Sequence, residues 1–337
     1  MTSSETPAPE AVPRFSARAL RPHVGRSLDR ILDAGILISL GVLVLVFTLL
    51  SPYFLTVANV KNIFEASAIT GVVAVGMTIG LIAGQFDLSV GSVVGFTSSA
   101  LAVLLTNQGM PVGWAILLSI GAALVFGLFN AFLVVAMNIN SIIATLGTLT
   151  AIRGIAFIIT SGKPIVTNDH FLNALGVNRF AGLAWSVWIM LLAYAIGYVI
   201  LHHTRLGIHV YAVGGNPVAA ERAGLSVGRL TFFVFLASAF TAAIGGILIT
   251  ARSFSGQAVF GQDMELDVLT AILLGGVGLR GGQGTLGKTL IGVIIVGVIN
   301  NGLVLTQVPG FYTDVVRGAA LVVAVVLEAI RERRALR

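Results

Sequence analysis

Few residues in this chain are of the types that carry out chemistry. The 337 residues include 14 Asp and Glu, 5 His and no Cys, so thiolate metal sites and cysteine nucleophiles are excluded. The histidines show no metal-ligand spacing with acids; they are His23, His170, His202, His203 and His209. No apolar segment presents a convincing pair of nucleophile and base. We therefore predict no catalytic residue, no metal site and no cofactor, in a chain that is not an enzyme.

One segment fits a nucleotide-binding motif. Residues 282–289, Gly-Gln-Gly-Thr-Leu-Gly-Lys-Thr, match the phosphate-binding pattern G-x-x-x-x-G-K-[ST] and also contain G-x-G-x-x-G. Such a loop works between a strand and a soluble helix, with an Asp-bearing strand that helps to hold magnesium. Here an apolar run of membrane-spanning length follows, and no partner strand is evident downstream. The pattern therefore does not indicate an ATPase.

Polar residues beside or inside apolar runs are candidates for a transport pathway or gate. Asp87 stands between two such runs, where it could cap the next helix with the help of Ser89, or act as a gate or interface carboxylate. Arg153 is the only clear charge in the middle of a run, and either a functional role or a structural pair with a carboxylate would explain it. Asn300 and Asn301 could hydrogen-bond the hydroxyls of a sugar, or could join helices to one another.

Glu265 and Asp267 follow the loop 252–264, which connects two apolar runs. They could contact a partner protein outside the membrane. A solvated helix start explains them equally well, because acidic side chains are favoured in the first turn of a helix.

The composition requires lipid around most of the chain. Apolar residues make up 56% of it and charged residues only 10%, and the mean hydropathy is +0.98. A soluble domain carries roughly 25% charged residues, since its surface must stay solvated. The net charge of +6 does not indicate nucleic-acid binding, because the basic residues lie at the ends of the chain and in short loops. We expect an all-α polytopic membrane protein.

About ten apolar runs approach the length that crosses a bilayer, roughly 20 residues. They lie at about 34–50, 61–83, 88–106, 113–136, 141–161, 183–201, 230–251, 265–279, 288–306 and 314–331. The run at 265–279 is the shortest and is expected to be a broken or tilted helix. Ten crossings place both termini on the same side of the membrane.

The distribution of Lys and Arg predicts that this side is the cytoplasm, since inner loops carry the basic excess. The inner side would then hold Arg14, Arg18, Arg21, Arg26, Arg30, Arg205, Arg222, Arg229, Arg280, Lys288, Arg331, Arg333, Arg334 and Arg337. The outer side would hold only Lys61, Lys163, Arg179, Arg252 and Arg317.

The longest inner loop, 202–229, contains a short helix whose two ends are marked. Asn216 is a good N-cap, Pro217 suits the first helical position, and Gly224 can end the helix in a left-handed conformation. Two turns are not stable alone in water, so the helix needs a partner surface. It could lie on lipid, pack on its own loop, or dock into a cytoplasmic motor protein. The predicted coupling residues are Gly215, Asn216, Pro217, Ala219, Ala220, Arg222 and Gly224.

Several segments in order resemble the permease subunits of ribose-, xylose- and galactose-type bacterial ABC importers. They are Gly84-Gln-Phe-Asp-Leu-Ser-Val-Gly-Ser92, Thr145-Leu-Gly-Thr148 with Arg153-Gly154, Ser161-Gly-Lys-Pro-Ile165, residues 211–224, Glu265-Leu-Asp-Val-Leu-Thr-Ala271, Gly281-Gly-Gln-Gly-Thr285 and Asn300-Asn-Gly302. The resemblance covers about residues 60–330. It adds Thr145 to the predicted pathway or gate residues.

The resemblance implies a division of labour. Two permease chains, expected to be a homodimer, form the pathway for a sugar or related small polar solute. A separate ATPase binds the loop around Asn216 to Gly224, and an extracytoplasmic binding protein delivers the solute, with Glu265 and Asp267 as its predicted docking residues. Access alternates between the two sides by differential stability of inward and outward states. The alternatives are an ABC permease for branched-chain amino acids or nucleosides, and an ion-driven secondary transporter.

The expected organisation has three parts. Residues 1–32 form a cytoplasmic tail that is disordered and then basic. Residues 33–331 form the transmembrane permease domain, with the coupling loop at 202–229, and residues 332–337 form a basic cytoplasmic tail. The expected location is the bacterial inner membrane, with both termini in the cytoplasm.

Overall fold

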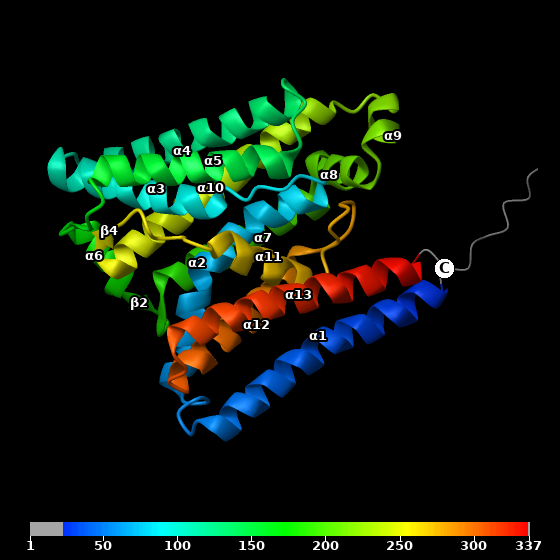
Figure 1. Cartoon of the computed structure of the whole chain (residues 1–337), viewed down its shortest axis with the longest axis horizontal. Helices are drawn as coiled ribbons and strands as arrows, with labels where there is room; N and C mark the ends of the chain where they lie inside the picture. Colours follow the sequence, from blue (N-terminus) through cyan, green and yellow to red (C-terminus); the bar gives the residue numbers. More distant parts are fainter. Residues whose placement is uncertain (1–22, 336–337) are drawn as a thin grey trace, which may run out of the picture.

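The structure is a computed structural model that describes residues 23–335, and it is almost entirely helical (Figure 1). The predicted tail 1–32 therefore lies mostly outside the described residues. In chain order the elements are α1 (His23–Leu50), α2 (Val57–Ile82), α3 (Val90–Ala102) with the π-turn η1 (Val103–Asn107), α4 (Val112–Val135), α5 (Ser141–Thr160), β1 (Ile165–Val166), α6 (His170–Val177), β2 (Arg179–Phe180), β3 (Leu183–Ala184), α7 (Trp185–His203), α8 (Arg205–Gly215), α9 (Pro217–Arg222), α10 (Val227–Ser253), β4 (Ser255–Gly256), α11 (Met264–Leu274), α12 (Leu286–Leu305) and α13 (Gly310–Ala335).

Helices α2, α3 and α10 form the centre of the molecule. Helix α10 packs against α2, α3 and α4, and every residue of α3 is buried. The α3 sequence Val-Gly-Ser-Val-Val-Gly-Phe-Thr-Ser-Ser-Ala-Leu-Ala consists mainly of small residues, which let neighbouring helix backbones approach closely. The main cluster of buried apolar side chains lies along these helices.

The surrounding helices present large apolar side chains outward. Ile158 of α5 is 76% exposed and Trp114 of α4 is 63% exposed. In Figure 1, α4 and α5 cover one side of the centre, while α1, α12 and α13 lie on the other. An outer surface of this kind is suited to hydrocarbon rather than water.

Seven helices within residues 23–335 are long and apolar enough to cross a membrane: α2, α3 with η1, α4, α5, α7, α10 and α12. The apolar part of α1, Gly35–Leu50, is shorter. The prediction of a polytopic all-α membrane protein is confirmed. The count of ten crossings stays a prediction.

The expected run at 265–279 is a shorter helix than predicted. Helix α11 has 11 residues, which span about 16 Å at the usual rise per residue. It ends before a glycine-rich loop, in which Gly276, Gly281, Gly282 and Gly284 have positive φ angles. This backbone conformation interrupts a helix and suits residues without a Cβ atom.

The bundle has two distinct ends in Figure 1. We call the end that carries α8 and α9 the α9 end. The last residues of α13 lie on that side. We call the opposite end the hairpin end, because it carries the antiparallel β2–β3 pair, with Arg179 opposite Ala184. The second strand pair, β1 with β4, tethers the segment after α5 to the segment after α10.

Candidate functional site

The short helix predicted in loop 202–229 is present as α9 and is capped as expected. The Asn216 side chain accepts a hydrogen bond from the Ala219 amide at 2.9 Å, and Pro217 is the first helical residue. Gly224 has a φ of +87°. Only Ala220 of α9 is buried, whereas Val218 is 57% exposed. The helix therefore offers most of its surface to a partner.

Helix α8 connects α9 to the body of the bundle through a close backbone contact. A methyl group on Gly214 would overlap the carbonyl oxygen of Ile82, at the end of α2. The Gly282 amide donates a hydrogen bond to the same Ile82 oxygen at 2.7 Å. We call this contact of Gly214, Ile82 and Gly282 the glycine junction. Because the three backbones touch, a movement of α8 must also move the end of α2 and the α11–α12 loop.

A tyrosine adds a second link from α8 to the same loop. The Tyr211 hydroxyl donates to the carbonyl oxygen of Gly284 at 2.8 Å. Burial raises the pKa of this hydroxyl above its usual value, so it remains a donor at neutral pH. Helix α8 is thus held at the loop by both backbone packing and a side chain.

Residues 282–289, which match the nucleotide-binding pattern, contribute Gly282 to the glycine junction. It is preceded by α11 and an irregular loop, and followed by the apolar helix α12. Thr285 is the N-cap of α12 and accepts from the Lys288 amide at 3.4 Å. Gly282 permits close contact with α2 and α8, so this glycine has a structural explanation without a bound phosphate.

Asp87 lies in the break between α2 and α3 and is only 4% exposed. Its Oδ1 accepts from the Ser89 amide at 3.0 Å and from the Ser89 hydroxyl at 2.6 Å. Its Oδ2 accepts from the Ser238 hydroxyl of α10 at 2.6 Å, and Asn130 of α4 donates to Ser89 at 2.9 Å. The two hydroxyl distances are in the range of charge-assisted bonds. Asp87 thus joins the break to α10 directly and to α4 through Ser89.

The predicted cap at this position is met only in part. Ser89 is the N-cap residue of α3 by position, and its side chain makes no cap bond. Asp87 accepts one backbone amide near the helix start, that of Ser89. Its other bonds are to side chains, so a cap alone does not account for the carboxylate.

Helix α5 satisfies two more amides of the break. The Phe86 amide donates to the Ser141 hydroxyl and the Leu88 amide to the Thr145 hydroxyl, each at 3.2 Å. Unpaired backbone groups are costly in hydrocarbon, so these hydroxyls stabilise the irregular segment. Thr145 therefore belongs to the same constellation as Asp87.

Arg153 holds the non-helical segment between α10 and α11. Its Nη1 donates to the carbonyl oxygens of Ala258 and Phe260, each at 2.9 Å, and its Nη2 donates to that of Gly261 at 3.2 Å. The bonded partners in the described part of the chain are backbone carbonyls, whereas a carboxylate pair was one of the expectations. The arginine satisfies carbonyls that would otherwise face a low-dielectric interior.

The two asparagines of α12 have different neighbours. Asn301 and Asn59 of α2 exchange amide hydrogen bonds at 2.9 and 3.0 Å, so Asn301 joins two helices. Asn300 accepts from Arg317 of α13 at 3.4 Å. Arg317 also pairs with Asp267 of α11 at 3.5 Å.

Glu265 is buried at 8% exposure, and its Oε2 has no hydrogen-bond partner among the described residues. A methyl group on Gly91 of α3 would overlap this oxygen, so α11 packs tightly on α3 here. The predicted role of Glu265 and Asp267 in docking a partner protein is not tested by this geometry. It would require a rearrangement that exposes Glu265.

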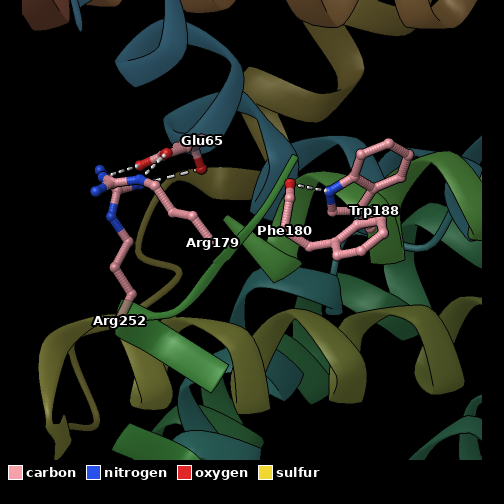
Figure 2. Close-up of polar contacts among 5 residues, drawn as sticks. All are labelled: Glu65, Arg179, Phe180, Trp188 and Arg252. Carbon is pink, nitrogen blue, oxygen red and sulfur yellow. Dashed lines mark hydrogen bonds and ion pairs between the residues drawn. The ribbon is translucent and has the colours of Figure 1, made fainter. Parts of the chain in front are cut away.

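At the hairpin end, two arginines converge on Glu65 of α2, as Figure 2 shows. Arg179 makes two bonds to the carboxylate, at 3.0 and 3.2 Å, and the pKa of Arg179 is raised by this pairing. Arg252 donates to the backbone oxygen of Glu65 at 3.2 Å. Trp188 donates to the Phe180 oxygen at 3.0 Å. These bonds fix the β2–β3 hairpin and the end of α10 to α2.

The sequence reasoning missed the partners of the predicted residues. Ser238 and Asn130 are single polar residues in long apolar runs, and only the packing brings them to the Asp87–Ser89 pair. Four uncharged polar residues of α2, at positions 59, 62, 67 and 70, carried a usable signal, because their spacing places them on one side of a helix. No group of three or more potential metal ligands occurs within residues 23–335.

Residues 59–325 match the family described as "Branched-chain amino acid transport system / permease component". This match covers the helices that form the glycine junction and the Asp87 constellation. The chain belongs to this family of transport permeases. The permease is therefore a transport subunit rather than an enzyme, and the family implies partners that hydrolyse ATP and bind the solute.

Individual relatives extend over nearly all of the permease. The probable ABC transporter permease protein YphD of Escherichia coli (strain K12) is 36% identical over 99% of this chain and 98% of its own length. The ribose import permease protein RbsC of Bacillus subtilis (strain 168) is 37% identical over 87% of this chain and 92% of its own. The L-arabinose transport system permease protein AraH of Escherichia coli (strain K12) is 34% identical over 93% and 95%. No solved structure matches the permease.

Proposed function

We propose that this permease forms the membrane pathway of an ATP-driven importer for a sugar or related small polar solute. The ribose and L-arabinose permeases among its relatives support this solute class. The observation that carries the mechanism is the glycine junction, which connects the exposed helix α9 to the break between α2 and α3. Force applied at α9 reaches the buried constellation through backbone contacts.

In this proposal α9 is the surface that docks the ATPase. Its docking residues are Gly215, Asn216, Pro217, Ala219, Ala220, Arg222 and Gly224, with Ala220 anchoring the helix to the bundle. Val218, at 57% exposure, adds an apolar contact. A pre-formed, capped helix suits force transfer, because little ordering is needed on docking.

The α9 end faces the cytoplasm in this proposal. It carries the basic residues of α8, α9, the start of α10 and the α11–α12 loop, which follow the inner-side excess. The hairpin end then meets an extracytoplasmic binding protein, with Glu265 and Asp267 becoming accessible when the outer side opens. A second copy of the permease completes the pathway. The cell location is the bacterial inner membrane.

The constellation of Asp87, Ser89 and Thr145 acts as the gate in this proposal. It is buried and polar. It lies at the break between the central helices α2 and α3, next to the glycine junction. Arg153, Asn300 and Asn301 hold neighbouring segments together in the outer half of the bundle. Their bonds to backbone and neighbouring side chains support a positioning role.

Reconstitution tests the proposal. The permease, its co-purified ATPase and the binding protein are placed in proteoliposomes, and uptake of labelled ribose, L-arabinose and leucine is measured with and without ATP. We expect ATP-dependent, vanadate-sensitive uptake of a sugar. Changing the exposed face of α9 with Val218→Asp and Arg222→Glu should abolish ATPase binding, whereas Lys163→Glu at the hairpin end should not.

The family description favours a second solute class, branched-chain amino acids. Leucine uptake without sugar uptake in the same vesicles would establish that alternative. Uptake that is abolished by an uncoupler and unaffected by vanadate would instead show an ion-driven transporter.

A further inference from the structure

Helix α2 carries a set of polar side chains in its half nearest the hairpin end. The helix is apolar overall, yet Asn59, Asn62, Ser67 and Thr70 lie within four turns of one another. Asn59 is engaged by Asn301. The other three have no such partner in the described part of the chain. Polar side chains facing lipid are costly, so this side of α2 is expected to meet water, a polar ligand or protein.

Asn62, Ser67 and Thr70 line a groove between α2 and α12 with a volume of about 200 Å³. Gly297 of α12 forms part of its floor, where a methyl group would overlap the Ser67 hydroxyl oxygen. Arg252 and Asn300 also line the groove. The volume is below the roughly 300–1,000 Å³ typical of pockets for drug-sized ligands. The groove is therefore too small for a drug-sized ligand and can hold only one small solute.

The groove has hydrogen-bonding capacity that the fold does not use. Ser67 is only 3% exposed, and its Oγ has no hydrogen-bond partner among the described residues. Leaving a buried hydroxyl without a partner destabilises the fold, so packing alone does not explain this serine. Asn62, which is exposed, and Thr70, which is half-buried, supply an amide and a second hydroxyl beside it.

The chemistry of the lining selects the class of solute. Amide and hydroxyl groups both donate and accept hydrogen bonds, as do the hydroxyl groups of a sugar. None of the described residues that line the groove is acidic, so no carboxylate is present to bind the ammonium group of an amino acid. The single lining cation, Arg252, already donates to the Glu65 backbone oxygen.

We infer that the groove between α2 and α12 is a subsite that binds a neutral polyhydroxylated solute of monosaccharide size through Asn62 and Thr70, beside the buried Ser67 hydroxyl. This inference rests on the proposed function and adds a specificity site within the permease itself. The subsite lies between the hairpin end and the Asp87 constellation, so a solute entering from the binding protein would meet it before the gate.

The test compares sugars with analogues that lack one hydroxyl. The reconstituted complex is supplied with saturating, solute-loaded binding protein, so that the binding protein's own affinity does not limit the rate. Ribose, L-arabinose and other pentoses and hexoses are screened first. Each single-deoxy analogue of the transported sugar is then measured on the wild type, Asn62→Ala and Thr70→Val. Asn178→Ala and Thr150→Val are the matched controls, because both parent residues are exposed and lie outside the groove.

We expect Asn62→Ala and Thr70→Val to slow transport of the intact sugar about three- to tenfold, the loss that one hydrogen bond predicts. Each variant should leave unchanged the rate for the analogue that lacks its hydroxyl partner. A merely structural defect would slow the sugar and all analogues equally, and that result, or no change at all, would overturn the inference. Failure of the wild type to import any sugar would instead refute the proposed function.

A labelling experiment separates a solute subsite from a contact between two permease copies. The chain has no cysteine, so Asn62→Cys is a unique probe. In the assembled complex we expect a small water-soluble thiol reagent to modify it, and the transported sugar to slow the reaction severalfold. Complete protection in the absence of sugar would show that a second copy covers the groove, and would overturn the inference.

Discussion

At the scale of single residues, the buried carboxylate of Asp87 is held by hydroxyl groups from two separate helical regions. Ser89 follows it in sequence, whereas Ser238 lies on α10. Removing the carboxylate would leave both serine hydroxyls without their acceptor. An amide in its place can still bond one of them.

We expect Asp87→Ala to lower the free energy of unfolding by about 2–4 kcal/mol, since each unpaired buried group costs about 1–3 kcal/mol. Asp87→Asn should cost about half as much, because neutral hydrogen bonds are weaker than charge-assisted ones. Thermal unfolding in detergent measures both. The control is Asp314→Ala, whose parent side chain is 75% exposed and should change the midpoint little. Equal unfolding midpoints for Asp87→Ala and Asp314→Ala would show that the hydrogen bonds of Asp87 do not stabilise the fold.

The reciprocal amide pair of Asn59 and Asn301 makes a second prediction at this scale. Polar pairs between membrane helices contribute about 0.6 kcal/mol on average, with a maximum near 1.7 kcal/mol. A double-mutant cycle with Asn59→Ala and Asn301→Ala should therefore give a coupling energy of about 1 kcal/mol. Pairing Asn301→Ala with Asn178→Ala should give a coupling near zero. Strict additivity of the first pair would show that the two amides do not interact.

At the scale of elements, the glycine junction determines how α8 sits on the bundle. Two adjacent glycines end α8, and an added methyl group would clash at only one of them. Gly214 lies against the Ile82 oxygen, whereas a methyl group on Gly215 would meet open space. Either glycine changed to alanine would gain similar helix propensity, so any difference between them reports on the junction.

We expect Gly214→Ala to destabilise this contact by about 1–3 kcal/mol, the usual cost of overpacking. ATP-driven uptake should fall about tenfold, while the ATPase still binds α9. Gly215→Ala, whose methyl group would meet open space, should lose much less uptake than Gly214→Ala. Uptake and co-purification of the ATPase, measured on the same preparations, separate coupling from docking. Equal transport by the two variants would exclude the junction as the route of force.

At the scale of the whole molecule, the two ends of the bundle differ in charge and structure. The α9 end carries an exposed short helix with basic residues around it, and the hairpin end carries small strands and the Glu65 ion pair. If the basic excess sets the orientation, the two ends face opposite sides of the membrane.

The cysteine-free chain allows a direct test of orientation. Lys163→Cys lies in the exposed turn after α5, and Ala219→Cys lies on the exposed part of α9. We expect a membrane-impermeant thiol reagent to label Lys163→Cys in intact cells. In cells that lack the ATPase subunit, Ala219→Cys should be labelled only after the cells are permeabilised. The reverse pattern would place α9 outside and rule out docking of a cytoplasmic ATPase there.

The sequence alone determined the features that depend on neighbours along the chain. Composition predicted the lipid environment, because too few charges are present to solvate a globule of this size. The caps of α9 could be identified for a related reason: Asn216, Pro217 and Gly224 act on their own helix through local backbone geometry.

Only the tertiary structure decided which polar residues meet. Ser238 reaches Asp87 across 151 residues of sequence, and Asn301 reaches Asn59 across 242. In a helix that is apolar on all sides, periodicity does not indicate which face meets which neighbour. Small residues let α2, α3 and α10 approach closely, and that packing sets the partners. The gate constellation, the glycine junction and the groove are therefore products of helix packing.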